Sequence, residues 1–324
     1  METRIIALNK LGLNVINSLP ISVVKNFDLV HIQDEKKEFI NSTSENNSKV
    51  SKILTNQNDI DQISYILESK DLDIFLCEIE NSNDYKFANE ILGSIKKNNE
   101  VILLIKKNNF LSHNQIKQIS TQATTTMFIN ENSLTAYEIG RFMFENSKKT
   151  LINNFVNSIV SINKIIYETG DINIDFADLM SVIKYSNISW FGNTISGGIN
   201  KSRDAVNKLF DLHFFEGEFY GVNSMIVQIV SGEEIKMNEV TDLSNRLKSF
   251  ANSKCNIFFG IKRKKIMYDQ IELIVLASSK NDFPIDNSIE YLQLNNTKEE
   301  ELIKLEEVHL PPFMRKKNIV TKIN

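Results

Sequence analysis

Residues 151–178 read LINNFVNSIVSINKIIYETGDINIDFAD, and this stretch separates two halves of the chain that differ in pattern. Its apolar residues recur at the i, i+3/i+4 spacing of one helix face. They are Leu151, Ile152, Phe155, Val156, Ile159, Ile162 and Ile166. The spacing predicts a long core helix over residues 138–170, closed by Gly170 as a left-handed C-cap. A short turn and a second helix to about Asn187 should follow.

The residues before this stretch alternate short apolar runs with amphipathic segments. The apolar runs are rich in β-branched residues and predict buried parallel strands at Thr3–Leu8, Phe27–Ile32, Leu72–Ile79, Glu100–Lys106 and Thr125–Ile129. The amphipathic segments predict helices at Leu11–Leu19, Asp59–Ser69, Asp84–Lys97 and His113–Ser120. Strand–helix alternation of this kind predicts a doubly wound, Rossmann-type α/β domain over residues 1–137.

The residues after the central stretch predict a smaller α+β domain over residues 171–279. Its expected strands and helix are Ser224–Val230, Asn256–Gly260, Ile271–Ala277 and Val240–Ala251. Residues 280–307 are charged and poorly patterned, which is typical of a flexible, solvated linker. Residues 308–318 combine an apolar anchor, a proline pair and a basic end, and this combination favours a short recognition peptide.

The composition excludes several classes of protein. The net charge is −4, whereas a nucleic-acid binder usually carries a basic surplus. Cys77 and Cys255 are far apart and match no zinc or redox spacing, so the sequence predicts no metal site and two buried thiols. The chain shows neither a signal-peptide pattern at its start nor an apolar run of membrane-spanning length. We therefore expect a cytoplasmic protein that does not insert into a membrane.

The turn at residues 173–178, NIDFAD, has two interpretations. In the structural one, Asp175 is a helix N-cap and Asp178 lies at the third helical position, an arrangement that contributes about 1 kcal/mol and is common. In the catalytic one, the two carboxylates and the amide of Asn173 position a water molecule for attack on a phosphate. The turn alone does not decide between them.

The surrounding sequence resembles FtsZ, the bacterial tubulin-like division protein. In that family a long central helix ends in a glycine and an Asn-x-Asp-Phe-Ala-Asp turn follows, as at Gly170 and residues 173–178 here. Gly192, Ser196-Gly197-Gly198 and the strand, acidic turn and helix of residues 221–250 follow in the family's order. Leu310-Pro311-Pro312-Phe313-Met314-Arg315 looks like the family's C-terminal peptide. The resemblance covers roughly residues 140–317.

This resemblance implies a tubulin/FtsZ-like fold and a place in the division septum. In FtsZ the nucleotide held by one subunit lies against the acidic turn of the next, in a head-to-tail filament. By this resemblance, the residues that act catalytically on a neighbour's nucleotide would be Asn173, Asp175 and Asp178. The tail at residues 309–317 would dock onto membrane-anchoring division proteins, and its contact residues would be Leu310, Pro311, Phe313, Met314 and Arg315.

The first half of the chain departs from the family pattern. Only Gly12 and Asn14 remain of the first glycine-rich loop, and the main phosphate-binding signature should fall at Glu78–Lys86. That segment reads EIENSNDYK, with no glycine and three acidic residues. A phosphate cradle needs clustered backbone N–H groups and close backbone approach, which side chains obstruct. We therefore expect weak binding of GTP, with GTP and Mg²⁺ supplied by a partner subunit or held by an atypical loop.

Three hypotheses follow from these residues. The first is a degenerate FtsZ-type division protein, which lacks autonomous GTPase activity and associates with FtsZ-type subunits, either its own copies or a second protein. The second is a polymerising GTPase with an atypical nucleotide loop. The third is a non-catalytic interaction module, in which the acidic turn is only a helix cap and the tail peptide carries the function.

Overall fold

The computed structural model describes residues 1–34, 50–55, 69–95, 99–106, 111–129, 147–211 and 222–279. All of these lie in one compact unit, Met1–Asp282. Several sequence predictions fall outside the described residues. They are nearly all of the helix Asp59–Ser69, residues 138–146 of the central helix, the linker 280–307 and the recognition peptide 308–318 with Leu310, Pro311, Phe313, Met314 and Arg315.

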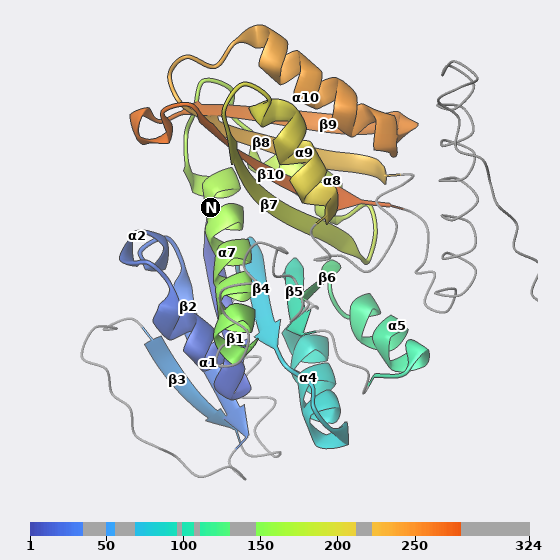
Figure 1. Cartoon of the computed structure of the whole chain (residues 1–324). Coiled ribbons are helices and arrows are strands. Elements are labelled where there is room, and N and C mark those ends of the chain that lie inside the picture. Colours follow the sequence, from blue (N-terminus) through green and yellow to red (C-terminus); the bar gives the residue numbers. More distant parts are fainter. Residues whose placement is uncertain are drawn as a thin grey trace, which may run out of the picture. The chain divides into compact units, whose positions relative to one another are not determined.

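The first half of the chain builds a six-stranded parallel sheet with the strand order β3-β2-β1-β4-β5-β6 (Figure 1). Five of the strands were predicted to within two residues. The edge strand β3 was not, because it follows a long polar segment and reads VSKILT, with few apolar residues. The strands are β1 (Thr3–Leu8), β2 (Asp28–Asp34), β3 (Val50–Thr55), β4 (Leu72–Cys77), β5 (Val101–Lys106) and β6 (Thr125–Ile129).

Helices cover both faces of this sheet, as a doubly wound domain requires. Ile5 and Ala7 of β1 pack in one apolar cluster with helices α1 and α7. Ile6 and Leu8 alternate to the other face and pack in a second cluster with α4 and α5. The helices are α1 (Asn9–Ser18), α2 (Ile21–Val24), α4 (Ser82–Ile95), α5 (His113–Thr121) and α7 (Ser147–Tyr167).

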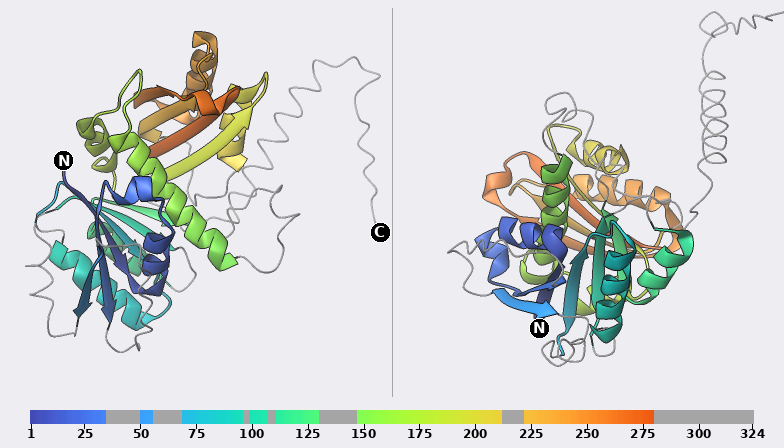
Figure 2. Two further views of the ribbon diagram at one scale, coloured as in Figure 1. Left: turned by 90° about the vertical axis from the view of Figure 1, so that its left-hand side faces the viewer. Right: turned by 90° about the horizontal axis from the view of Figure 1, so that it is seen from below.

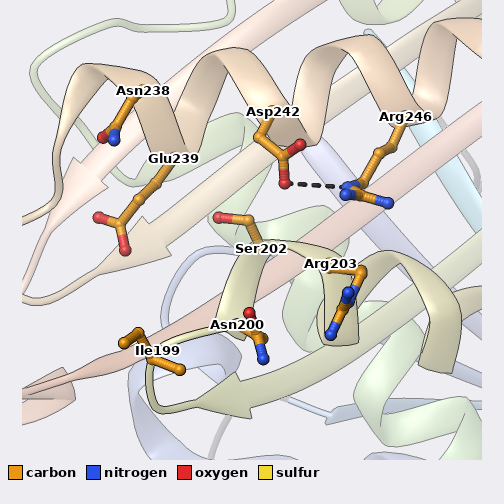
Figure 3. Close-up of a pocket in the computed structure, with 8 residues that line it drawn as sticks. All are labelled: Ile199, Asn200, Ser202, Arg203, Asn238, Glu239, Asp242 and Arg246. Atoms are coloured by element: carbon orange, nitrogen blue, oxygen red, sulfur yellow. Dashed lines mark hydrogen bonds and ion pairs between the residues drawn. The ribbon is translucent and has the colours of Figure 1, made fainter.

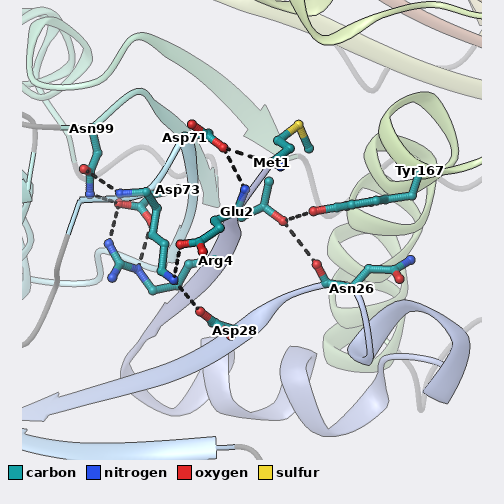
Figure 4. Close-up of polar contacts among 11 residues, drawn as sticks. Met1, Glu2, Arg4, Asn26, Asp28, Asp71, Asp73, Asn99 and Tyr167 are labelled. Atoms are coloured by element: carbon teal, nitrogen blue, oxygen red, sulfur yellow. Dashed lines mark hydrogen bonds and ion pairs between the residues drawn. The ribbon is translucent and has the colours of Figure 1, made fainter.

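A buried ion pair joins the amino ends of β1 and β4 (Figure 4). The Arg4 guanidinium donates from Nε and Nη2 to the two carboxylate oxygens of Asp73, at 2.8 and 2.9 Å. Asn99 Nδ2 donates to the same carboxylate at 2.6 Å. Both charged side chains are almost fully buried. This bidentate pair fixes the sheet at the end opposite to the carboxyl edge, where ligands of open α/β sheets bind.

The second half forms a mixed four-stranded sheet with the order β7-β10-β8-β9. Strand β7 was missed in the sequence because its segment, SWFGNTISG, contains glycines and polar residues that hide the alternation. The strands are β7 (Ser189–Gly197), β8 (Val222–Ser231), β9 (Ala251–Arg263) and β10 (Gln270–Ser278). The helices are α8 (Phe176–Ile183), α9 (Lys201–Asp211), α10 (Met237–Phe250) and the 3-10 turn η1 (Lys265–Met267).

The central helix α7 lies between the two sheets (Figure 2). Leu151, Phe155, Ile159 and Ile162 are buried, in agreement with the predicted stripe. One apolar cluster extends from the first sheet across α7 and α8 to Ile226, Ile274 and Leu276 of the second. A separate cluster on the far face of the second sheet packs it against α9 and α10.

Within the described ranges, no helix has both the length and the apolar character needed to cross a membrane.

Candidate functional site

The acidic turn begins α8 and forms a reciprocal capping box. Asp175 is the N-cap, and its Oδ1 accepts a hydrogen bond from the Asp178 backbone N–H at 2.7 Å. Asp178 Oδ2 accepts one from the Asp175 N–H at 3.1 Å. The local interpretation of the two aspartates as a helix cap is therefore confirmed. Each carboxylate still has a second oxygen that the box does not use, so capping and an external contact are compatible.

Gly170 has a different role from the predicted left-handed cap. Helix α7 ends at Tyr167, and Gly170 does not have a positive φ. The glycine is required because the turn passes directly over β9. A Cβ atom at Gly170 would lie 3.1 Å from the Ile261 carbonyl carbon and would clash with the carbonyl oxygen. The prediction failed because the partner strand lies about 90 residues away, beyond the reach of a local pattern.

Backbone hydrogen bonds fasten the turn to β9. The N–H groups of Asp171 and Ile172 both donate to the Ile261 carbonyl, at 2.8 and 3.1 Å. The Ile261 N–H donates back to the Ile172 carbonyl at 2.9 Å. Within the turn, Asn173 Oδ1 accepts the Gly170 N–H at 2.6 Å. These bonds give the turn a defined shape before any partner binds.

Three basic residues at the end of β9 add ion pairs to this attachment. Glu168 lies 2.9 Å from Lys262 Nζ and 2.8 Å from Lys264 Nζ. Partial burial opposes ionisation of Glu168, but the ion pairs with Lys264 and Lys262 outweigh it and lower its pKa. Arg263 donates to Asp171 from Nε and Nη2, at 2.8 and 3.0 Å, and these hydrogen bonds lower the pKa of the Asp171 carboxyl.

The turn presents its polar groups to solvent. Asn173 and Asp175 are exposed, and Asp178 is half-exposed, whereas Ile174 between them is buried as the apolar anchor of the segment. The structure thus brings the three predicted catalytic residues together on one rigid, accessible turn. Such a turn can position a water molecule or contact a second protein.

The carboxyl edge of the first sheet has no open glycine-rich loop at β1. Helix α1 starts at Asn9, immediately after β1, and Gly12 and Asn14 lie inside this helix. Gly12 is buried against β1, where an added Cβ would lie 2.9 Å from Ala7 Cβ. Asn9 has a positive φ of 62°. Gly12 therefore permits close packing of helix on strand.

The connection from β4 to α4 uses its own side chains to satisfy its backbone N–H groups. Asn81 Oδ1 accepts the N–H groups of Asn83 and Asp84, at 2.9 and 3.0 Å. Asp84 Oδ2 accepts the Glu80 N–H at 3.1 Å and Asn81 Nδ2 at 2.8 Å. Lys106 pairs with Glu78 at 2.7 Å. Three backbone N–H groups around the N-terminus of α4, those of Glu80, Asn83 and Asp84, are thus bound by side-chain oxygens and are not open to a phosphate.

No protein-family model matches this chain. The cell division protein FtsZ of Coxiella burnetii is 22% identical over 202 residues, which are 62% of this chain and 52% of that protein. FtsZ of Wigglesworthia glossinidia brevipalpis is 24% identical over 123 residues, 38% of this chain and 32% of that protein. The chain thus matches about half of the first relative's length and about a third of the second's.

Solved structures match over a larger share of the chain. An empty FtsZ dimer from M. jannaschii aligns with a TM-score of 0.69 at 13% identity, covering 86% of this chain and 88% of that one. GDP-form protofilaments of TubZ from Bacillus thuringiensis align with a TM-score of 0.66 at 11% identity, covering 98% and 94%. The chain is a divergent FtsZ-like protein with the tubulin/FtsZ fold. The resemblance and the fold class predicted from the sequence are both confirmed.

In this FtsZ-like protein, the residues that support the acidic turn were missed by sequence reasoning. The basic run at residues 262–265 gave no prediction of such a role, but Lys262 and Arg263 belong to β9, and Lys262, Arg263 and Lys264 all form ion pairs with residues next to the turn. The sequence does contain both partners, the basic run and the acidic residues Glu168 and Asp171. A single sequence does not show that they lie side by side in the fold.

Proposed function

We propose that this chain is a cytoplasmic cell-division protein that works at the division site by associating with FtsZ-type subunits. It joins a neighbouring subunit head-to-tail through the acidic turn, and it binds nucleotide only weakly itself. The nucleotide that the neighbour holds contacts the side chains of Asn173, Asp175 and Asp178. The FtsZ of C. burnetii and that of W. glossinidia are named as cell division proteins, which supports the cellular role.

The contrast between the two ends of the protein carries this proposal. The acidic turn is exposed, rigidly attached and complete in its three polar residues. At the edge that would hold phosphates, three backbone N–H groups are bound by the side chains of Asn81 and Asp84. Its acidic residues would also repel a polyphosphate in a poorly solvated cleft. This contrast supports a chain that acts on a neighbour's nucleotide and binds its own only weakly.

The turn acts on the neighbour's nucleotide by positioning a water molecule. A carboxylate oxygen of Asp175 or Asp178 that lies outside the capping box can accept a proton of a water molecule, and the Asn173 amide can orient it. Catalysis of phosphoryl transfer comes mainly from such positioning and from charge stabilisation. GTP and Mg²⁺ are then brought by the partner subunit.

The tail makes a second contact. Residues 309–317 bind a membrane-anchoring division protein, with Leu310, Phe313 and Met314 as apolar anchors and Arg315 as the charged end. This contact is independent of the turn, so deletion of residues 308–318 should remove it without affecting binding to filaments.

Co-sedimentation with a polymerising FtsZ from the same cell tests the head-to-tail contact. The informative variants are Asp175→Asn and Asp178→Asn, because asparagine caps a helix about as well as aspartate while it removes the charge. Glu90→Gln, at an exposed position on α4, is the matched control for loss of one carboxylate. We expect wild type and the control to pellet with FtsZ and the two turn variants to pellet less. Failure of wild type to pellet would reject the proposal.

Two further outcomes separate the alternatives. Micromolar binding of labelled GTP by the chain alone, with turnover, would establish a polymerising GTPase with an atypical loop. The capping box favours the interaction module as the second candidate, because it gives the aspartates a sufficient structural role. Unchanged association of Asp175→Asn and Asp178→Asn, with loss on removal of residues 308–318, would support that module.

A further inference from the structure

A hollow of about 230 Å³ lies between α9 and α10 (Figure 3). Of the eight residues that line it, Ile199 alone is apolar. Its volume is below the roughly 300–1,000 Å³ of pockets that hold drug-sized ligands, so it suits a smaller molecule. Ordinary ligand pockets are lined mostly by apolar side chains, whereas this lining favours a ligand that is itself strongly polar.

A buried hydroxyl without a partner faces the hollow. Ser202 is only 6% exposed, and its Oγ has no hydrogen-bond partner among the described residues. Figure 3 shows this side chain pointing from α9 into the space below α10. Buried polar groups nearly always have a partner, so an orphaned one indicates that a water molecule or a ligand completes the site.

Asp242 of α10 supplies a free carboxylate oxygen opposite this hydroxyl. Its Oδ2 accepts a hydrogen bond from Arg246 Nε at 2.9 Å, and its Oδ1 accepts none from the described part of the chain. The second acid of the hollow, Glu239, is already paired with Lys201 at 3.1 Å. Ser202 Oγ and Asp242 Oδ1 are therefore two acceptors, one neutral and one charged, for an ammonium group.

Two guanidinium groups lie beside these acceptors (Figure 3). Arg246 uses only its Nε for Asp242, so its terminal N–H groups remain available as donors. Arg203 Nε lies 3.9 Å from Asp204 Oδ1, which is beyond hydrogen-bond distance. Guanidinium groups present N–H donors in a planar fork that matches a carboxylate. This side of the hollow is therefore suited to a carboxylate.

We infer that the hollow binds a free α-amino acid as its zwitterion. The ammonium group lies between Ser202 and Asp242, and the carboxylate contacts Arg203 and Arg246. Asp242 and Arg246 are one helical turn apart and already touch, so the two charged groups of the ligand must also be close together. In an α-amino acid a single carbon atom separates them.

The mixed charge of the hollow excludes simpler ligands. A purely anionic ligand would be repelled by the carboxylates of Asp242 and Glu239, and a purely cationic one by the two guanidinium groups. A zwitterion places each of its charges beside the opposite charge of the protein. The inference does not depend on the proposed contact with FtsZ.

Calorimetric titration of the full chain with each of the common L-amino acids tests the inference. We expect saturable binding of at least one of them, with a dissociation constant of about 1 mM or below, as suits so small a ligand. Its N-acetyl derivative lacks the ammonium charge and its amide lacks the carboxylate. Each of these should bind about tenfold more weakly or worse.

Two variants locate the binding in the hollow. Ser202→Ala should weaken it about fivefold, the effect of one lost hydrogen bond, and should not lower the melting temperature because no hydrogen bond within the chain is lost. A purely structural role of this serine would predict a lower melting temperature with unchanged affinity. Arg203→Gln should weaken binding about tenfold. Ser244→Ala and Lys248→Gln, on α10 outside the hollow, are the matched controls and should bind as wild type does.

The remaining outcomes reject the inference. Absence of saturation with every amino acid, at concentrations about tenfold above the expected constant, means that water alone fills the hollow. If the N-acetyl derivative or inorganic phosphate binds as tightly as the amino acid, the hollow is an anion site. If Ser202→Ala and Arg203→Gln both bind as wild type does, the amino acid binds elsewhere. None of these results bears on association with FtsZ, which co-sedimentation measures separately.

Discussion

Replacing Gly170 by alanine or asparagine tests why a glycine stands at this position. A Cβ there would clash with the Ile261 carbonyl, so the turn must move away from β9. The move would break or stretch three backbone hydrogen bonds between Ile261 and residues 171 and 172. Over-packing costs roughly 1–3 kcal/mol and each lost hydrogen bond about 1 kcal/mol. Because the turn can relax partially, we expect the free energy of unfolding to fall by about 2–4 kcal/mol.

Urea unfolding followed by fluorescence of Trp190, the chain's single tryptophan, measures this change. Amide hydrogen exchange at Asp171 and Ile172 reports whether the turn detaches locally. Gly197→Ala is the control, because its Cβ would meet the movable Gln270 side chain at 3.3 Å and the Asp269 carbonyl oxygen at an ordinary contact distance of 3.6 Å. The asparagine variant discriminates between the two roles, since a left-handed cap tolerates asparagine better than alanine. Near-wild-type stability of Gly170→Asn would refute the close-approach explanation.

Three further predictions concern buried charge, the obstructed phosphate edge and pH. Asp73→Leu leaves the buried Arg4 guanidinium without its carboxylate partner, so the free energy of unfolding measured in urea should fall by about 3–5 kcal/mol. The double variant with Arg4→Met should recover most of this loss. Asp84→Gly removes the carboxylate that binds the Glu80 N–H, so inorganic phosphate should raise the melting temperature of this variant but not of wild type; equal responses would contradict the account. Glu168 and Asp171 have pKa values below their ordinary 4.5 and 3.8, so their stabilisation is present above those values and is lost as pH falls through the lowered ones. The free energy of unfolding should therefore fall as the pH is lowered below these ordinary values, and less steeply in Lys264→Met.

The elements that the sequence predicted well are those whose pattern is local. Strands β1, β4, β5 and β6 are buried on both faces, so each is a short, mostly apolar run that can be recognised without its partner strand. The capping box of Asp175 and Asp178 spans only four residues, and the structure has it as expected. Strands β3 and β7 were missed because an edge position and a glycine-containing segment remove that pattern.

The sequence by itself thus determined the α/β class, the long central helix and the FtsZ-like resemblance. It also showed that the chain has an acidic turn and is poor in glycine. Only the tertiary structure decided that Gly170 serves a close approach to β9, that the basic run holds the turn, and that Asn81 and Asp84 bind the N–H groups of the phosphate edge. The physical reason is that caps and apolar periodicity act over a few residues, whereas clashes, ion pairs and surface patches depend on which strands lie side by side.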